Sequence, residues 1–292
     1  MADDLIAEER ELSVDYAEPR KPVRRMLEHQ IAAGLAEMER PPVGLFIAGL
    51  SAGLDVGFSL LLIAITLTHA RGVLSEPVVE LLAANMYAVG FIFVIVGQSQ
   101  LFTEHTTLAA LPVLHGRASL NTLARLWGIV YTSNLIGGAI FAALAVTIGP
   151  ALNVIEPSIL GEIARGVVDH HWWVILISGI LAGWLMGLAS WLVAAGRDTI
   201  SQIVLVWLVT VAVRFAHLHH SITGTVEVLA GLFAGQAVTW HDFGHFLLWA
   251  TLGNAFGGIF FVAVIKYSHV VRSQKGTPKV DLDESKSLVT AD

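Results

Sequence analysis

Long apolar segments alternate with short polar ones between residues 44 and 268 of the chain. A helix of about 20 apolar residues is long enough to cross a bilayer, and each of these segments reaches that length. The six segments are 44–69, 78–115, 121–149, 173–195, 200–236 and 244–268. The pattern therefore predicts an all-α membrane protein with six transmembrane helices, in a transmembrane domain over residues 44–270.

The flanking segments are more polar, and we predict an N-terminal tail over 1–43 and a C-terminal tail over 271–292. Between Pro22 and Glu39 the apolar residues recur at helical spacing, which predicts an amphipathic helix. Its apolar positions are Val23, Met26, Leu27, Ile31, Leu35 and Met38. Such a helix could lie on the membrane surface, cover a pore entrance, or simply be solvated.

Composition and charge agree with a membrane protein. Only 14% of the residues are charged, against about 25% in soluble domains. The net charge of −7 argues against a nucleic-acid partner, and the absence of cysteine excludes disulfides and thiolate metal sites. An inside N-terminus places 14 of the 17 basic residues on the cytoplasmic side, so both termini are predicted to be cytoplasmic.

Two motifs occur once in each half of the apolar region, which predicts an internal repeat. Three spans in each half would make the second copy inverted, and inverted repeats place a substrate path near the membrane midplane. The first pair, 134 residues apart, is Ala48-Gly49-x-x-x-Gly53-Leu54 and Ala182-Gly183-x-x-x-Gly187-Leu188. The second pair, 120 residues apart, is Asn134-x-x-Gly137-Gly138-x-x-Phe141 and Asn254-x-x-Gly257-Gly258-x-x-Phe261.

The second and fifth segments are too long for one crossing, and each has a polar centre, at 97–107 and 214–227. Irregular backbone at membrane depth is tolerated only where protein or a water-filled cavity satisfies it. We therefore predict two broken helices whose interruptions face each other across a pore. Half-helix N-termini directed inward would favour an anion.

The residues at these interruptions resemble motifs of the formate/nitrite transporter family. Leu101-Phe102-Thr103 is similar to the family's Leu-Phe-Thr, and His220-Ser221-Ile222 is similar to its His-Ser-[Val/Ile] with the pore histidine. The resemblance covers about 40–270. It implies an aquaporin-like protomer, a homopentamer with one pore per subunit, and passage of small monovalent anions or their conjugate acids. It also implies a divergent bacterial inner-membrane transporter with no enzymatic activity and no cofactor.

The chain departs from the family pattern at four positions. Gly183 stands where the resemblance places an Asn early in the fourth helix. His219 stands where the family usually has Glu, Gly224 where it has Asn, and Glu104 where it often has Ser. These departures bear on the identity of the solute more than on the fold.

The predicted pore centres on His220, because an imidazole can offer a proton or a charged hydrogen bond near neutral pH. We expect the Thr103 hydroxyl to orient it and Ser221 to lie beside it in the pore lining. Leu101, Phe102 and Leu218 are predicted to form apolar constrictions. From the family resemblance, Phe91 and Val213 also line these gates.

A second group of polar residues is expected near the pore rather than in it: His219, Glu104, His105, Arg214, Asp55 and Glu227. Charges at membrane depth face a cavity or each other. Arg214 could add positive field beside the path, or pair with Asp55 or Glu227, and we favour the structural pair.

The alternative interpretation is a histidine-rich membrane di-iron enzyme of the hydroxylase or desaturase type. Imidazole is a suitable iron ligand. The candidate clusters are His217-x-His219-His220, Asp169-His170-His171 and His241-x-x-x-His245. The predicted topology places the last two at external loops and the first near the midplane, so we predict no metal site and no catalytic residue.

Overall fold

The computed structural model describes residues 21–273 of the chain, and every regular element among them is a helix. The first twenty residues and most of the predicted C-terminal tail lie outside this range. The helices before the midpoint are α2 (Val23–Glu39), α3 (Pro42–Asp55), α4 (Gly57–Ala70), α5 (Glu76–Val96), α6 (Phe102–Leu108), α7 (Ala110–Leu114) and α8 (Leu120–Ala151). Those that follow are α9 (Pro157–Val168), α10 (Trp172–Ala195), α11 (Thr199–Phe215), α12 (Ser221–Phe233), α13 (Trp240–Phe256), the π-helix η1 (Gly257–Val264) and α14 (Ile265–Ser273).

Five helical runs among the described residues are long and apolar enough to cross a membrane. They are Pro42–Ala70, Glu76–Val96, Leu120–Ala151, Trp172–Ala195 and Trp240–Arg272. The predicted fifth segment, 200–236, consists instead of two shorter apolar helices, α11 and α12. The fold is thus all-helical, with long membrane helices and interruptions where the sequence predicts broken ones.

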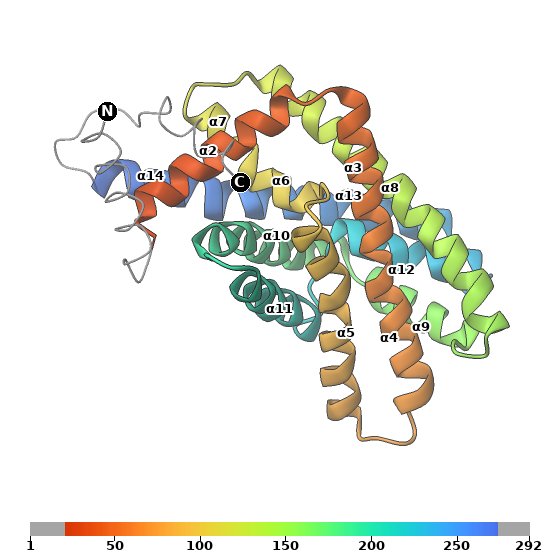
Figure 1. Ribbon diagram of the computed structural model, residues 1–292. Helices are drawn as coiled ribbons and strands as arrows, with labels where there is room; N and C mark the ends of the chain where they lie inside the picture. The colour runs from red at the N-terminus through yellow and green to blue at the C-terminus, as the bar shows by residue number, and fades with distance from the viewer. Residues whose placement is uncertain (1–20, 274–292) are drawn as a thin grey trace.

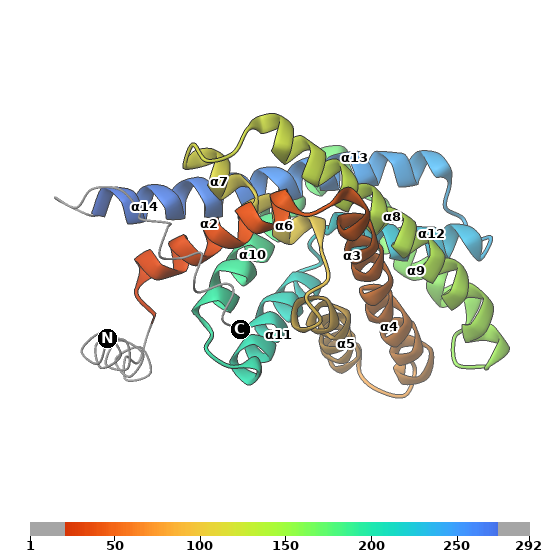
Figure 2. The ribbon, with the colours of Figure 1, turned by 45° about the horizontal axis from the view of Figure 1, so that its top comes forward.

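The helices define two ends of the molecule (Figures 1 and 2). At one, which we call the α2 end, α2 packs against α7 and α14. At the opposite one, the α9 end, α9 lies near the loop between α4 and α5. Arg71 of that loop forms an ion pair with Glu162 of α9. The two ends are the expected faces toward the two sides of the membrane.

Helix α2 buries the apolar face that the sequence predicts. Leu27 and Ile31 are fully buried in a cluster with residues of α7, α10 and η1. The Gln30 side chain donates a hydrogen bond to the backbone oxygen of Ser190, at 2.9 Å. The helix is therefore part of the folded body rather than a free solvated lead-in.

Close backbone approach joins α3 to α8 and α10 to α13. A Cβ added at Gly53 would overlap the backbone of Asn134, and one added at Gly183 would overlap the backbone of Asn254. Gly53 and Gly183, which lie 130 residues apart, thus make equivalent contacts. The sequence pairing of Gly49 with Gly183 was wrong by one helical turn, because a small-xxx-small pattern matches itself when it is shifted by four residues.

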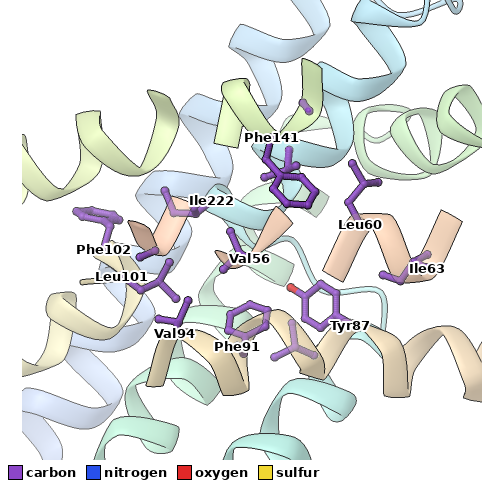
Figure 3. Close-up of a cluster of buried hydrophobic side chains, with 14 of the residues drawn as sticks. Val56, Leu60, Ile63, Tyr87, Phe91, Val94, Leu101, Phe102, Phe141 and Ile222 are labelled. Carbon is purple, nitrogen blue, oxygen red and sulfur yellow. The ribbon is translucent and has the colours of Figure 1, made fainter. Parts of the chain in front are cut away.

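A buried apolar cluster fills the space between α4, α5 and the two interruptions (Figure 3). Phe91 and Val94 of α5 lie close to Leu101, which precedes α6, and to Ile222 of α12. The interruptions therefore lie inside the molecule, surrounded by packed side chains.

Candidate functional site

The two interrupted helices end in the same way. The Ser99 N–H donates to the Val94 carbonyl, and the Leu218 N–H donates to the Val213 carbonyl, each at 3.0 Å. This bond from a residue to the one five positions earlier closes a Schellman motif. The left-handed residues of the two motifs are Gln98, with φ of 55°, and His217, with φ of 51°. Non-glycine residues take this conformation infrequently, so the surrounding structure imposes both breaks.

Asn134 of α8 fixes the first interruption. Its side-chain oxygen accepts from the Phe102 N–H at 2.8 Å. Its amide nitrogen donates to the carbonyls of Gly49, at 2.7 Å, and Gln100, at 2.8 Å. One buried amide thus satisfies two backbone groups of the interruption, at Gln100 and Phe102, and ties them to a carbonyl inside α3.

Asn254 of α13 does the same at the second interruption. Its oxygen accepts from the Ser221 N–H at 2.8 Å, and its nitrogen donates to the carbonyls of Gly179 and His219, at 2.8 and 2.9 Å. Sequence reasoning identified both asparagines as repeat markers but missed this role. The signal was present, since a buried Asn requires partners and broken backbone supplies them.

Thr103 and His220 meet where the two interruptions face each other. The Thr103 hydroxyl lies 2.8 Å from Nε2 of His220, and both residues are at most 3% exposed. His220 is the N-cap of α12, and its Nδ1 accepts from the Thr223 N–H at 3.2 Å. Because a backbone N–H can only donate, Nδ1 carries no proton, and the neutral ring holds its proton at Nε2, toward Thr103.

Apolar side chains enclose this polar pair. The Phe91 ring lies edge-on to the His220 ring, with centroids 5.1 Å apart and planes at 89°. Phe91, Leu101 and Val213 are fully buried, and the partly buried Leu218 packs against the same cluster. All five predicted apolar pore residues therefore belong to one buried cluster, with Leu218 at its partly buried edge.

Phe102 belongs to the same cluster, but its aromatic contacts lie on the α8 side. Its ring packs on Tyr131 and Trp127 of α8, with centroids 4.8 and 6.0 Å away. In Figure 3 it lies on the far side of Leu101 from Phe91. The buried Ser221 hydroxyl, next to His220, has no hydrogen-bond partner.

A small cavity adjoins His220 toward the α9 end. About 30 Å³ of it is open to the centre of a water molecule, and its lining includes Arg214, His219 and Glu227. No direct ion pair joins Arg214 to Glu227 among the residues that the structure describes. Nor does Arg214 pair with Asp55, whose carboxylate accepts from the hydroxyls of Ser99, at 2.9 Å, and Ser51, at 3.2 Å.

His219 is anchored to the surrounding helices. Its Nε2 donates to the Val167 carbonyl of α9 at 3.0 Å, and its Nδ1 contacts the Ser178 hydroxyl of α10. At Gly224, a Cβ would collide with the Phe246 ring. Where the family usually has Glu and Asn, this chain thus has a tethered imidazole and a glycine packed under an aromatic ring.

The remaining predicted residues lie toward the α2 end. His105 Nδ1 donates to the Leu101 carbonyl at 2.9 Å, while its buried Nε2 has no partner. Glu104 lies half-buried in the first turn of α6. The Gln100 side chain donates to Glu37 of α2 at 3.2 Å, which connects α2 to the first interruption.

Histidines do not assemble into a metal centre within residues 21–273, where no group of three or more potential ligands is close enough to hold an ion. The rings of His170 and His219 do meet, with centroids 5.2 Å apart. These two residues come from different candidate clusters, and they meet because α9 packs against α12. Nothing in this arrangement supports the di-iron alternative.

The chain has sequence relatives among known membrane proteins. The chain is 32% identical over 278 residues to the inner membrane protein YfdC of Escherichia coli, covering 94% of this chain and 87% of the relative. It is 28% identical over 240 residues to the nitrite transporter NirC of Salmonella typhimurium, covering 81% and 87%.

Solved structures show the same fold. A structure titled FNT family ion channel superimposes with a TM-score of 0.77 at 25% identity, covering 84% of this chain and 98% of the other. A pentameric formate channel with formate bound matches with a TM-score of 0.67 at 20% identity, covering 80% and 98%. The sequence model of the formate/nitrite transporters matches residues 24–268, and this chain belongs to that family.

Proposed function

We propose that this chain forms a membrane pore that passes small monovalent anions or their conjugate acids, with the Thr103–His220 contact at its narrow centre. The observation that carries the proposal is this buried polar pair, at 2.8 Å, placed where two interrupted helices meet inside an apolar enclosure. Members of the family are channels and transporters, so we assign no catalytic residue.

The physical problem for such a pore is desolvation. An isolated carboxylate costs many kcal/mol to move into an apolar constriction. His220 offers a proton or, when charged, a strong hydrogen bond at the point of greatest cost. The N-terminus of α12 begins beside it and contributes partial positive charge. Together these groups lower the barrier for an anion or a weak acid and not for a cation.

The neighbouring residues have separate roles in this proposal. Thr103 orients the imidazole, and the unpartnered hydroxyl of Ser221 offers a hydrogen bond to a passing solute. Leu101, Leu218, Phe91 and Val213 form the apolar walls that exclude water and hydrated cations. Phe102 supports the wall from the α8 side, and Glu104 and His105 lie on the approach from the α2 end.

The proposed architecture is a six-span inverted repeat of the aquaporin-like kind, in which α11, residues 216–220 and α12 together make the fifth crossing. The matched roles of Asn134 and Asn254 support the repeat, as do the matched Schellman motifs. We propose that the chain is a homopentamer of a bacterial inner membrane, with both termini in the cytoplasm. The pentameric formate channel and the inner membrane protein YfdC support this by analogy, and the basic residues support the orientation.

Flux measurements on the reconstituted full chain test the proposed function. Proteoliposomes receive inward gradients of formate, nitrite, acetate, lactate and hydrosulfide at several pH values, and uptake is followed by stopped-flow light scattering. We expect at least one of the small solutes to enter faster than into protein-free liposomes, while gluconate, a bulky anion, does not. If every solute enters at the protein-free rate, the proposal is wrong.

A further inference from the structure

The cavity toward the α9 end contains two charged side chains with unused polar atoms. Arg214 lies in the last turn of α11, and its Nε atom is buried without a partner. Glu227 of α12 is 5% exposed, and its Oε1 atom also has no partner. Both side chains line the cavity beside His220.

The unpaired polar atoms of Arg214 and Glu227 require a hydrogen-bond partner inside the cavity. A buried polar atom left unpaired is costly, and charges in membrane helices normally face a partner or a filled cavity. A single water needs about 10–15 Å³ of space by this measure, and the cavity provides about 30 Å³. The space is therefore large enough for more than one water or for a ligand of a few atoms.

The other basic side chains near this cavity already have partners elsewhere. His217 at its rim lies 3.9 Å from the Glu80 carboxylate, and Arg71 of the nearby loop pairs with Glu162. His219 is held by Val167 and by the Ser178 hydroxyl. Among the lining residues this leaves the Arg214 guanidinium as the cation that faces the cavity, with the Glu227 carboxyl as its counterpart.

We infer that this cavity is an anion-binding subsite, in which the Arg214 guanidinium binds a small planar monovalent anion of the carboxylate or nitrite kind before it reaches His220. The inference rests on the proposed function, since the subsite adjoins the proposed pore. A planar guanidinium presents paired N–H groups that match two oxygen atoms of such an anion. Glu227 limits how strongly the anion is held, because its negative charge opposes that of the ligand.

Two readouts test the subsite on the reconstituted or purified full chain. The first is the half-saturating formate concentration for initial flux. The second is the rise in unfolding temperature that formate or nitrite causes in detergent. We expect Arg214→Gln to raise the half-saturating concentration about tenfold or more and to abolish the thermal rise, because it removes a charged hydrogen bond. Arg214→Lys keeps the charge, so we expect its half-saturating concentration and thermal rise to lie between those of the wild-type protein and Arg214→Gln.

Two further variants sharpen the comparison. Arg165→Gln makes the same charge change on α9, outside the cavity lining, and is expected to leave both readouts unchanged. Glu227→Gln removes the opposing charge and is expected to lower the half-saturating concentration. If Arg214→Gln does not fold, the same two readouts are measured on Arg214→Lys and Glu227→Gln instead.

The assignment of an anion subsite is wrong if folded Arg214 and Glu227 variants match the wild-type protein in both the half-saturating concentration and the thermal rise. That result would mean that the cavity holds water alone. A wild-type protein that passes no small anion would instead overturn the proposed function. The thermal rise would still decide whether Arg214 binds formate or nitrite, so the two failures are distinguishable.

Discussion

Single side chains hold the two interruptions in place. At each, an asparagine amide uses its oxygen and its nitrogen to satisfy three backbone groups. His220 then caps α12 through Nδ1, which directs its Nε2 proton toward Thr103. The geometry of the proposed pore centre therefore depends on hydrogen bonds made outside the pore.

Replacing Asn254 tests this dependence. Asn254→Leu removes three hydrogen bonds of about 1 kcal/mol each and leaves the Ser221 N–H and the His219 carbonyl without their partner in an apolar setting. We expect the unfolding temperature in detergent to fall and formate flux to drop. Asn254→Asp keeps the acceptor for Ser221 but sets a carboxyl oxygen against two carbonyl oxygens, so it too is expected to lower the unfolding temperature. Wild-type stability in Asn254→Leu would contradict the assigned role.

The sequence predicted that Thr103 and His220 meet, but it did not predict all the contacts of the surrounding charged residues. Thr103 and His220 were predictable as a pair because each lies at the polar centre of an overlong apolar segment. The partner of Arg214 was not predictable, because Asp55 is occupied by two serines and Glu227 lies across a cavity. Such choices depend on positions in space that helical spacing does not specify.

At the scale of helices, close packing of α3 on α8 and of α10 on α13 positions the asparagines. The packing depends on glycines whose missing Cβ lets two backbones approach, at Gly53 and Gly183. The sequence predicted this kind of contact but assigned it the wrong register. The sequence also predicted no helix at α9. That helix is too short to span a membrane, and α12, against which it packs, lies far along the chain.

Two glycine-to-alanine changes separate packing from helix propensity. An added Cβ at Gly183 would overlap the Asn254 backbone, so we expect Gly183→Ala to lower the unfolding temperature and to impair flux. Gly128, inside α8, has nothing within 4 Å of such a Cβ. Gly128→Ala is expected to be neutral or to stabilise by about 0.5–1 kcal/mol, since alanine favours the helix. Equal thermal stability of the two variants would contradict the packing account.

At the scale of the whole molecule, the described chain carries many large apolar side chains on its outer surface, including Leu144 and Ile148 of α8 and Leu248 and Leu252 of α13. A bilayer or neighbouring subunits would cover such a surface. We expect native mass spectrometry of the detergent-solubilised protein to give five copies of the 31.4 kDa chain. A monomer that still conducts in liposomes would show that the pore needs no pentamer, and a different closed oligomer would refute the predicted assembly.

Formate flux through proteoliposomes containing His220→Asn, compared with wild-type protein at equal incorporation, tests whether the imidazole of His220 is needed for transport. Asparagine is a good N-cap, so it can replace Nδ1 as the acceptor for the Thr223 N–H and leave α12 intact. It cannot supply a titratable proton or a charged hydrogen bond. We expect a flux at least about tenfold lower, without the pH dependence of the wild-type protein. Wild-type flux with an unchanged pH profile in a folded His220→Asn protein would contradict this prediction.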